Sequence, residues 1–314
     1  MKHSSAGRLL RGVALVALLG LAVTTLGGCS NVATLEPSSG KLSVVTSVNT
    51  WGSLAAEVGG KFVDVKSIIN DPRQDPHSYQ ATVRDQLAVN QADLVIANGA
   101  GYDPFIDSLA KSARQHLLLV ANSIETPIAE KNPHIWYSIA ADIEVVGLLA
   151  KRFNAAQPKH AKYFGVNAAN LIQRLSKLLM QEKSFKTFAL QHKIAAVATE
   201  GIADLMLRDC GIKNVTPSAF ALAVQNDTEI PPQALAAAKA LITNGKVRFL
   251  VTNIQVQTPE SKILAALAQL SPLRAGLHAV QEVPMSELLP AGVGFVNWIA
   301  NNLNALTYSA VKAA

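Results

Sequence analysis

The chain has 314 residues and a formal net charge of +6 at pH 7, with 49% hydrophobic and 5% aromatic residues. This length is sufficient for two domains of ordinary size. The positive surplus is modest and dispersed, without a run of Lys and Arg, so it argues against a nucleic-acid partner.

Residues 1–28 have the pattern of a signal peptide. Lys2, Arg8 and Arg11 precede an apolar run of fourteen residues, Val13–Leu26, which is shorter than the roughly 20 residues that a membrane-spanning helix needs. Removal of residues 1–28 leaves 25 basic and 22 acidic residues, a net charge of +3. Part of the positive charge therefore belongs to the targeting segment.

The segment Leu26-Gly27-Gly28-Cys29 resembles the bacterial lipobox, in which the cysteine is lipidated through its sulfur and becomes the mature N-terminus. The resemblance implies that Cys29 is a lipid anchor; the alternative is an ordinary signal peptide with a chance cysteine. Residues 29–40 have the composition of a short flexible tether. Cys210 then has no partner for an intramolecular disulfide and is expected to be a small buried apolar residue.

Apolar runs and helical patterns alternate in the first half of the chain. The expected strands are Leu42–Val48, Val63–Ile69, Leu94–Asn98 and His116–Val120. The expected helices are Trp51–Val58, Thr82–Asn90 and Pro104–Ala113. Because strands separated by helices form parallel, right-handed sheets, we expect an N-terminal α/β lobe over residues 41–157.

The second half repeats this alternation without a visible sequence repeat. The expected strands are Ile194–Thr199, Arg248–Thr252 and His278–Val283. The expected helices are Ile202–Cys210, Pro232–Thr243, Pro259–Leu270 and Val293–Leu306. We therefore expect a C-terminal α/β lobe over residues 186–314.

The segment between the two halves has a different pattern. Ser138–Lys183 contains no strand-like run, and after Pro158 the apolar residues recur at largely helical spacing. A proline suits the first turn of a helix, so the pattern predicts one long helix over residues 158–185 that connects the lobes. The alternative is a pair of helices packed on one domain.

Four side chains are candidate metal ligands. His77 and His134 each follow a proline in a polar loop after an extended segment, where the imidazole can point towards a cleft. Glu200 follows an expected strand and precedes an expected helix, the position at which open α/β sheets place ligand groups; it could instead stabilise a helix N-terminus. Glu287 could equally be a solvated loop acid before Pro290.

Two imidazoles and two carboxylates form a nitrogen and oxygen shell with two negative charges. This set suits Mn²⁺ or Zn²⁺, and the absence of thiolates argues against a Cys-rich structural zinc site. Binding is expected to be sensitive to acid, because a histidine must lose its proton to coordinate.

Several segments, in the order found here, together resemble one protein family. They are Asp75-Pro76-His77-Ser78-Tyr79 with Arg84-Asp85, Ala92–Gly99, Asn132-Pro133-His134-Ile135-Trp136, Asn253–Glu260, and Glu287-Leu288-Leu289-Pro290 with Phe295 and Trp298. Over nearly all of residues 41–310 the chain is similar to the metal-binding solute-binding lipoproteins of ABC importers, called cluster A-I or cluster 9, which deliver zinc or manganese.

The resemblance implies an α/β fold of two lobes with a metal site in the cleft between them. Its ligands would be His77 and His134 from the first lobe, and Glu200 and Glu287 from the second. Zinc-type members often have a histidine at the third position and a long His- and acid-rich loop, so Glu200 and the lack of that loop favour the manganese-type set. Zn²⁺ remains a strong competitor. The usual fourth ligand of the manganese type is an aspartate, which leaves Glu282 as an alternative to Glu287.

The resemblance further implies a monomeric, lipid-anchored protein at the extracytoplasmic face of the cell membrane. It would capture one Mn²⁺ or Zn²⁺ ion and deliver it to an ABC permease, with no enzymatic activity of its own. The long connecting helix would restrict hinge closure, so release would depend on small motions of the lobes and loops.

Other functions are compatible with parts of the pattern. A metal-dependent hydrolase would also use His and Glu ligands, although the sequence has no His-Glu-x-x-His motif and four ligands leave no obvious position for a nucleophilic water. A surface adhesin or a binder of chelated metal could be built on the same fold. A chelate binder should need a broader, more aromatic or basic pocket, and aromatics make up only 5% of the chain.

Overall fold

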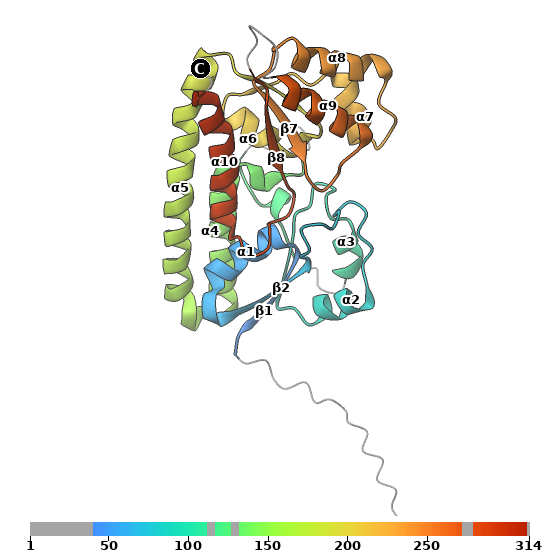
Figure 1. The fold of residues 1–314 in the computed structure, drawn as a ribbon. Helices are drawn as coiled ribbons and strands as arrows, with labels where there is room; N and C mark the ends of the chain where they lie inside the picture. Colours follow the sequence, from blue (N-terminus) through green and yellow to red (C-terminus); the bar gives the residue numbers. More distant parts are fainter. Residues whose placement is uncertain (1–39, 112–116, 127–131, 272–278, 313–314) are drawn as a thin grey trace, which may run out of the picture. The chain divides into compact units, whose positions relative to one another are not determined.

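The computed structural model describes residues 40–111, 117–126, 132–271 and 279–312 (Figure 1). Within these ranges, no helix combines the length and the apolar character that crossing a membrane requires. The expected signal peptide, Cys29 and all of the expected tether except Gly40 lie outside the described residues.

The first half of the chain forms a parallel four-stranded sheet with the strand order β2-β1-β3-β4. Its strands are β1 (Leu42–Val48), β2 (Val63–Ile69), β3 (Leu94–Ala97) and β4 (Leu117–Leu119). Its helices are α1 (Asn49–Gly59), α2 (Val83–Asn90) and α3 (Phe105–Leu109). The expected elements are all present, although α3 ends earlier than the sequence predicts.

Strand β1 is buried on both faces, as a central parallel strand covered by helices should be. Val44 and Val48 belong to the hydrophobic cluster that contains Trp51 of α1. Val45 belongs to a separate cluster with Val89 of α2 and residues of α3. Because successive side chains of a strand point to opposite faces, this one strand holds helices on both sides of the sheet.

The second half forms another parallel four-stranded sheet, with the order β6-β5-β7-β8. Its strands are β5 (Ala195–Ala198), β6 (Lys213–Asn214), β7 (Phe249–Asn253) and β8 (Gln281–Met285). Its helices are α6 (Asp204–Asp209), α7 (Ser218–Gln225), α8 (Pro232–Thr243), α9 (Pro259–Leu270) and α10 (Phe295–Lys312). Both sheets have the same order of strands along the chain, which confirms the expected architecture.

Two helices join the sheets. Helix α4 (Ile139–Ala156) is followed by a short 3₁₀ turn at Pro158–His160 and then by α5 (Ala161–Gln191). The predicted long helix is therefore present and continues beyond residue 185. Its 31 residues span about 46 Å at the usual helical rise.

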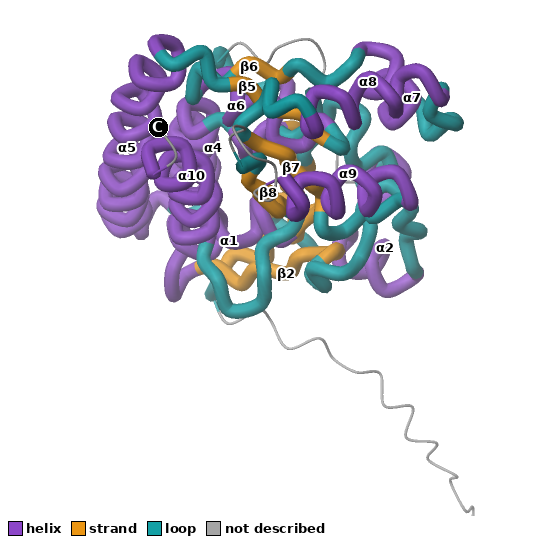
Figure 2. The backbone as a smooth tube through the Cα atoms, turned by 45° about the horizontal axis from the view of Figure 1, so that its top comes forward, coloured by secondary structure: helices purple, strands orange, loops and turns teal. Residues whose placement is uncertain are grey.

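Helix α5 packs along α4 and also contacts α1, α6 and α10. Figures 1 and 2 show α4, α5 and α10 side by side. The alternative of a helical pair is correct in that α4 and α5 pack together, but the pair contacts helices of both halves rather than one. The lobe boundaries at residues 157 and 185 remain predictions.

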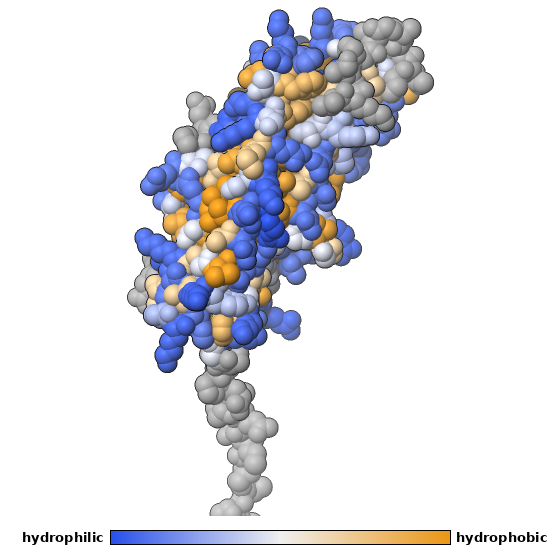
Figure 3. Space-filling model, turned by 90° about the vertical axis from the view of Figure 1, so that its left-hand side faces the viewer, coloured by the Kyte–Doolittle hydropathy of each residue, from blue (hydrophilic) through white to orange (hydrophobic). Residues whose placement is uncertain are grey.

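The side of the molecule that carries α5 is mixed in character. Figure 3 shows hydrophobic side chains interspersed among hydrophilic ones on this face. Val166, Met180 and Leu190 are the large hydrophobic residues that α5 exposes.

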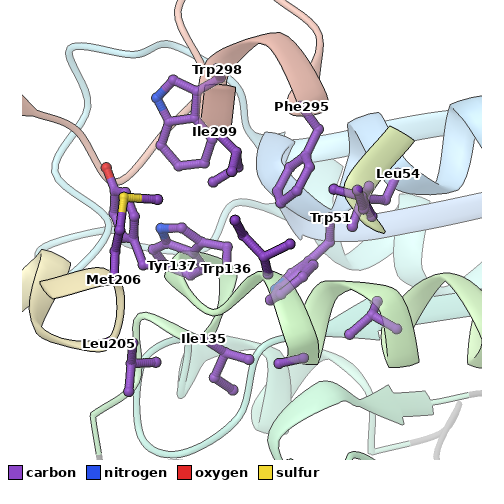
Figure 4. Packing of buried hydrophobic residues seen from close by; sticks show 14 of the residues in the cluster. Trp51, Leu54, Ile135, Trp136, Tyr137, Leu205, Met206, Phe295, Trp298 and Ile299 are labelled. Atoms are coloured by element: carbon purple, nitrogen blue, oxygen red, sulfur yellow. The ribbon is translucent and has the colours of Figure 1, made fainter. Parts of the chain in front are cut away.

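The main hydrophobic cluster contains residues from both halves of the chain. Figure 4 shows Trp51 of α1, Trp136 and Tyr137, Met206 of α6, and Phe295 and Trp298 of α10 packed together. The rings of Trp51 and Trp136 meet edge to face with centroids 5.9 Å apart, a favourable aromatic geometry. Trp136 lies two residues after His134, so this core fixes the backbone on which one candidate ligand stands.

Candidate metal centre

His77 lies in the loop between β2 and α2. The backbone N–H of His77 donates to Asp75 Oδ1 at 2.9 Å. Farther along the loop, the Tyr79 hydroxyl donates to Asp85 Oδ2 at 2.6 Å, and Asp85 forms a reciprocal capping box with Thr82 at the start of α2. This capping arrangement ties the loop to a helix N-terminus. The His77 side chain is 42% exposed.

His134 is held by two asparagines. Asn132 Oδ1 accepts from the His134 backbone N–H at 2.9 Å and lies 3.0 Å from the His134 Nδ1 atom. Asn98, which follows β3, donates from Nδ2 to the Pro133 carbonyl at 2.8 Å. With the ring proton on Nδ1 directed at Asn132, Nε2 keeps its lone pair. That Nε2 atom is buried and has no hydrogen-bond partner among the residues that the structure describes.

The two glutamates stand beyond the carboxyl ends of strands in the second sheet. Glu200 follows β5 and directly precedes the 3₁₀ turn Gly201–Ala203. Glu287 follows β8 and is completely buried. The carboxyl edge of a parallel sheet is where α/β proteins place ligand groups.

The structure brings all four candidate residues to one point. His77, His134, Glu200 and Glu287 each offer one nitrogen or oxygen atom, and these atoms lie within 4.8 Å of one another. Glu287 Oε2 is 3.3 Å from His77 Nε2 and 3.6 Å from His134 Nε2. An ion with bonds of about 2.1 Å places its ligand atoms roughly 3–4 Å apart, so the group fits a single bare cation with a small contraction.

Glu282, the alternative fourth residue, does not belong to this group. It lies on β8, where its Oε1 accepts from Thr252 Oγ1 at 3.2 Å and its Oε2 lies 3.5 Å from Gln269 Nε2. Glu287 is therefore the acid that the structure places beside the two histidines.

The electrostatics of the group are those of a cation site. Burial, reinforced by the neighbouring Glu287 carboxylate, raises the pKa of Glu200. Burial also acts to raise the pKa of Glu287, but its contacts with the imidazoles of His134 and His77 outweigh burial and hold that pKa well below its usual range. Contact with Glu287 raises the pKa of His77. A divalent cation would relieve the repulsion between the two carboxylates.

Polar side chains that the sequence did not single out surround the carboxylates. The Tyr102 hydroxyl donates to Glu287 Oε2 at 2.9 Å, and burial raises the pKa of Tyr102 well above its ordinary value, so it stays a donor. Asn253, the last residue of β7, donates from Nδ2 to Glu200 Oε2 at 2.9 Å and to Glu287 Oε1 at 2.8 Å. Asn253 belongs to a motif recognised in the sequence, but nothing local indicates its partners.

Three polar contacts link the two halves of the chain close to the site. Asn132 Nδ2 donates to the carbonyl of Gly201 at 2.8 Å. Gln255 Nε2 donates to the Gln74 carbonyl at 3.3 Å. Asn49 of α1 and the backbone of Leu289 exchange two hydrogen bonds of 3.0 Å. The loops that carry the four candidate ligands are therefore joined to one another.

Residues 44–308 match the family model of the periplasmic component A of the zinc-uptake complex. The chain belongs to this family. Members are substrate-binding components of an uptake system and not enzymes, which removes the hydrolase alternative.

A curated relative is the manganese ABC transporter substrate-binding lipoprotein PsaA of Streptococcus pneumoniae. It is 25% identical over 270 residues, which cover 80% of this chain and 85% of the relative. The range that matches the family model, residues 44–308, extends over both sheets and includes the segments of all four candidate ligands.

Among solved structures, the periplasmic zinc-binding protein TroA of Treponema pallidum matches with a TM-score of 0.70 and 19% identity, covering 86% of this chain and 99% of TroA. The laminin-binding adhesin Lmb of Streptococcus agalactiae matches with a TM-score of 0.68 and 19% identity, covering 85% and 99%. At these identities the likeness shows the fold alone. The name of Lmb is therefore no evidence that this chain is an adhesin.

Proposed function

We propose that the protein captures one divalent metal ion, Mn²⁺ or Zn²⁺, and delivers it to an ABC permease. The observation that carries the proposal is the convergence of four ligand atoms within 4.8 Å. One of them is a buried imidazole nitrogen to which no residue in the described ranges is hydrogen-bonded. Buried polar atoms are rarely left unpaired. A bound cation would give the lone pair of His134 Nε2 a partner.

The ligand set consists of His77, His134, Glu200 and Glu287. Two neutral imidazoles and two carboxylates suit both Mn²⁺ and Zn²⁺. The family model is named for zinc uptake and the name of the relative PsaA states manganese, which supports these two ions for this chain. The close approach of the four atoms favours a bare ion over a chelate.

Lipidation at Cys29 is part of the proposal. The relatives PsaA and FimA are described as lipoproteins, and the segment before Cys29 has the lipobox pattern. We expect a monomer held by this anchor at the extracytoplasmic face of the cell membrane, where it meets both the ion and the permease.

Metal content and competitive titration test the function. Protein that begins at residue 30, stripped of metal and titrated with Mn²⁺ and Zn²⁺, should bind one equivalent. Glu200→Ala should lose this binding, because it removes one of the four ligands. Glu282→Ala is the matched control, since it removes a carboxylate that lies outside the group. Absence of stoichiometric metal in the unaltered protein at neutral pH would refute the proposal.

A further inference from the structure

The side-chain amide of Asn253 donates a hydrogen bond to each of the two carboxylates of the site. The residue is 2% exposed, and its two side-chain N–H bonds are directed at Glu200 Oε2 and Glu287 Oε1. The other end of the amide is also fixed, because Asn253 Oδ1 accepts from the backbone N–H of Gln255 at 2.9 Å. Only the nitrogen can therefore face the carboxylates.

Each glutamate thus has one oxygen engaged by Asn253. In Glu287 the other oxygen, Oε2, is the one that faces His77 and His134, and the Tyr102 hydroxyl holds it there. In Glu200 the other oxygen, Oε1, receives no hydrogen bond from any residue within the described ranges. The hydrogen bonds from Asn253 therefore fix the orientation of both carboxylates, and in that orientation Glu287 turns one oxygen, Oε2, towards the two imidazoles.

The number of oxygens that each carboxylate offers decides the coordination number. One oxygen from each gives two nitrogens and two oxygens, the four-coordinate shell that Zn²⁺ prefers. Two oxygens from each would give a six-coordinate shell, which suits Mn²⁺. For both oxygens of one carboxylate to bind the same ion, the carboxylate would have to turn towards it, and this rotation would distort its hydrogen bond to Asn253.

We propose that Asn253 is a specificity-determining residue that holds Glu200 and Glu287 to one coordinating oxygen each and so favours four-coordinate Zn²⁺ over six-coordinate Mn²⁺. Asn253 is not itself a ligand and acts through the two carboxylates. The inference rests on the proposed function, because it assigns the preferred ion at the same site.

Two variants and one spectroscopic probe test the inference. Asn253→Ala and Asn253→Ser remove the shared donor, and Thr252→Val is the matched control on the same strand, because Thr252 contacts Glu282 outside the site. Competitive titration should show that the ratio of Zn²⁺ to Mn²⁺ affinity falls by roughly tenfold or more in the Asn253 variants, the scale typical of residues that orient ligands. The control should keep the ratio of the unaltered protein.

Co²⁺ reports the coordination number directly, since four-coordinate Co²⁺ absorbs visible light far more strongly than six-coordinate Co²⁺. The unaltered protein loaded with Co²⁺ should show the intense bands, and the Asn253 variants should show weaker ones. Weak bands in the unaltered protein would overturn the inference without any variant. An unchanged affinity ratio in a folded Asn253 variant would also overturn it. If the unaltered protein bound neither ion, the proposed function itself would fail.

Discussion

At the scale of single residues, the sequence named the four candidate ligands but not their supporting partners. The positions of His77, His134 and Glu200 after extended segments made them candidates, the family resemblance completed the set with Glu287, and the structure shows that the four side chains converge. Tyr102 reaches Glu287 across 185 positions of the chain. No local signal records such a contact, because it depends on how two sheets face each other.

Asn132 is expected to control metal affinity through His134. Asn132→Ala removes the acceptor that orients the His134 ring, and loss of such a partner commonly lowers metal affinity by roughly 10- to 100-fold. Titration of the variant with Zn²⁺ measures the effect. Asn304→Ala, which removes an exposed amide of α10 that accepts a hydrogen bond from Gln181, should keep the affinity. Equal affinities of the two variants would contradict this role of Asn132.

At the scale of elements, periodicity predicted both sheets but not every boundary. The sequence did not predict β6 or α7. Strand β6 consists of two exposed residues and has no apolar run to mark it. Helix α5 continues to Gln191 rather than ending at residue 185, because Phe185 and Ala189 extend its buried face. The sequence shows which positions of a helix form its apolar face. The residue at which the helix ends depends instead on the neighbouring helices against which that face packs.

Helix α5 also buries a carboxylic acid. Glu182 is 3% exposed, and Asp142 of α4 is completely buried. Neither oxygen of Asp142 has a hydrogen-bond partner within the described part of the chain. Burial, and after it the Asp209 carboxylate of α6, raises the pKa of Glu182 to about 7, against the opposing charges of Lys186, Lys183 and Arg208. Burial, and after it Glu182, raises the pKa of Asp142. This helix junction therefore favours protonated acids.

Stability should depend on pH through Glu182. Its pKa is raised from 4.5 in the unfolded chain to about 7 in the folded protein, so its favourable contribution is complete below pH 4.5 and is lost as the pH rises through 7. Glu182→Gln keeps a neutral side chain at every pH. Relative to the unaltered protein, the variant should gain on the order of 2 kcal/mol of unfolding free energy between pH 5 and pH 8.

Denaturant unfolding at the two pH values measures this difference. Glu229→Gln is the control, since Glu229 is an exposed loop residue and its substitution should leave the pH dependence unaltered. A Glu182→Gln variant whose stability changes with pH in parallel with the unaltered protein would contradict the prediction.

At the scale of the whole molecule, the site depends on contacts between the two halves. Asn49 and Leu289 exchange two buried hydrogen bonds two residues from Glu287. Asn49→Ala should lower the unfolding free energy by about 1–3 kcal/mol, because the buried Leu289 groups lose their partners. It should also speed metal dissociation, measured by stopped-flow transfer to a chelator. Unchanged dissociation would show that the contact stabilises the fold without holding the site.

Metal binding should raise thermal stability. Because the ligands come together only in the folded chain, free metal at about 100 times the dissociation constant should add about 2.7 kcal/mol. Differential scanning calorimetry with and without Zn²⁺ checks this. Glu200→Ala should show no shift in Tm, and a shift of normal size in that variant would place the bound metal elsewhere.

The four ligand segments are spread along the chain from residue 77 to residue 287. Two lie in the half that forms the first sheet, and two lie in the half that forms the second. No single segment offers a cation more than one ligand atom. A growing or unfolded chain therefore lacks this four-ligand site, which forms only when the last strand of the second sheet is in place. The first ion bound is then drawn from the metal supply of the compartment in which folding finishes rather than from the supply where the chain is synthesised, and the preference of the site selects among the ions present there.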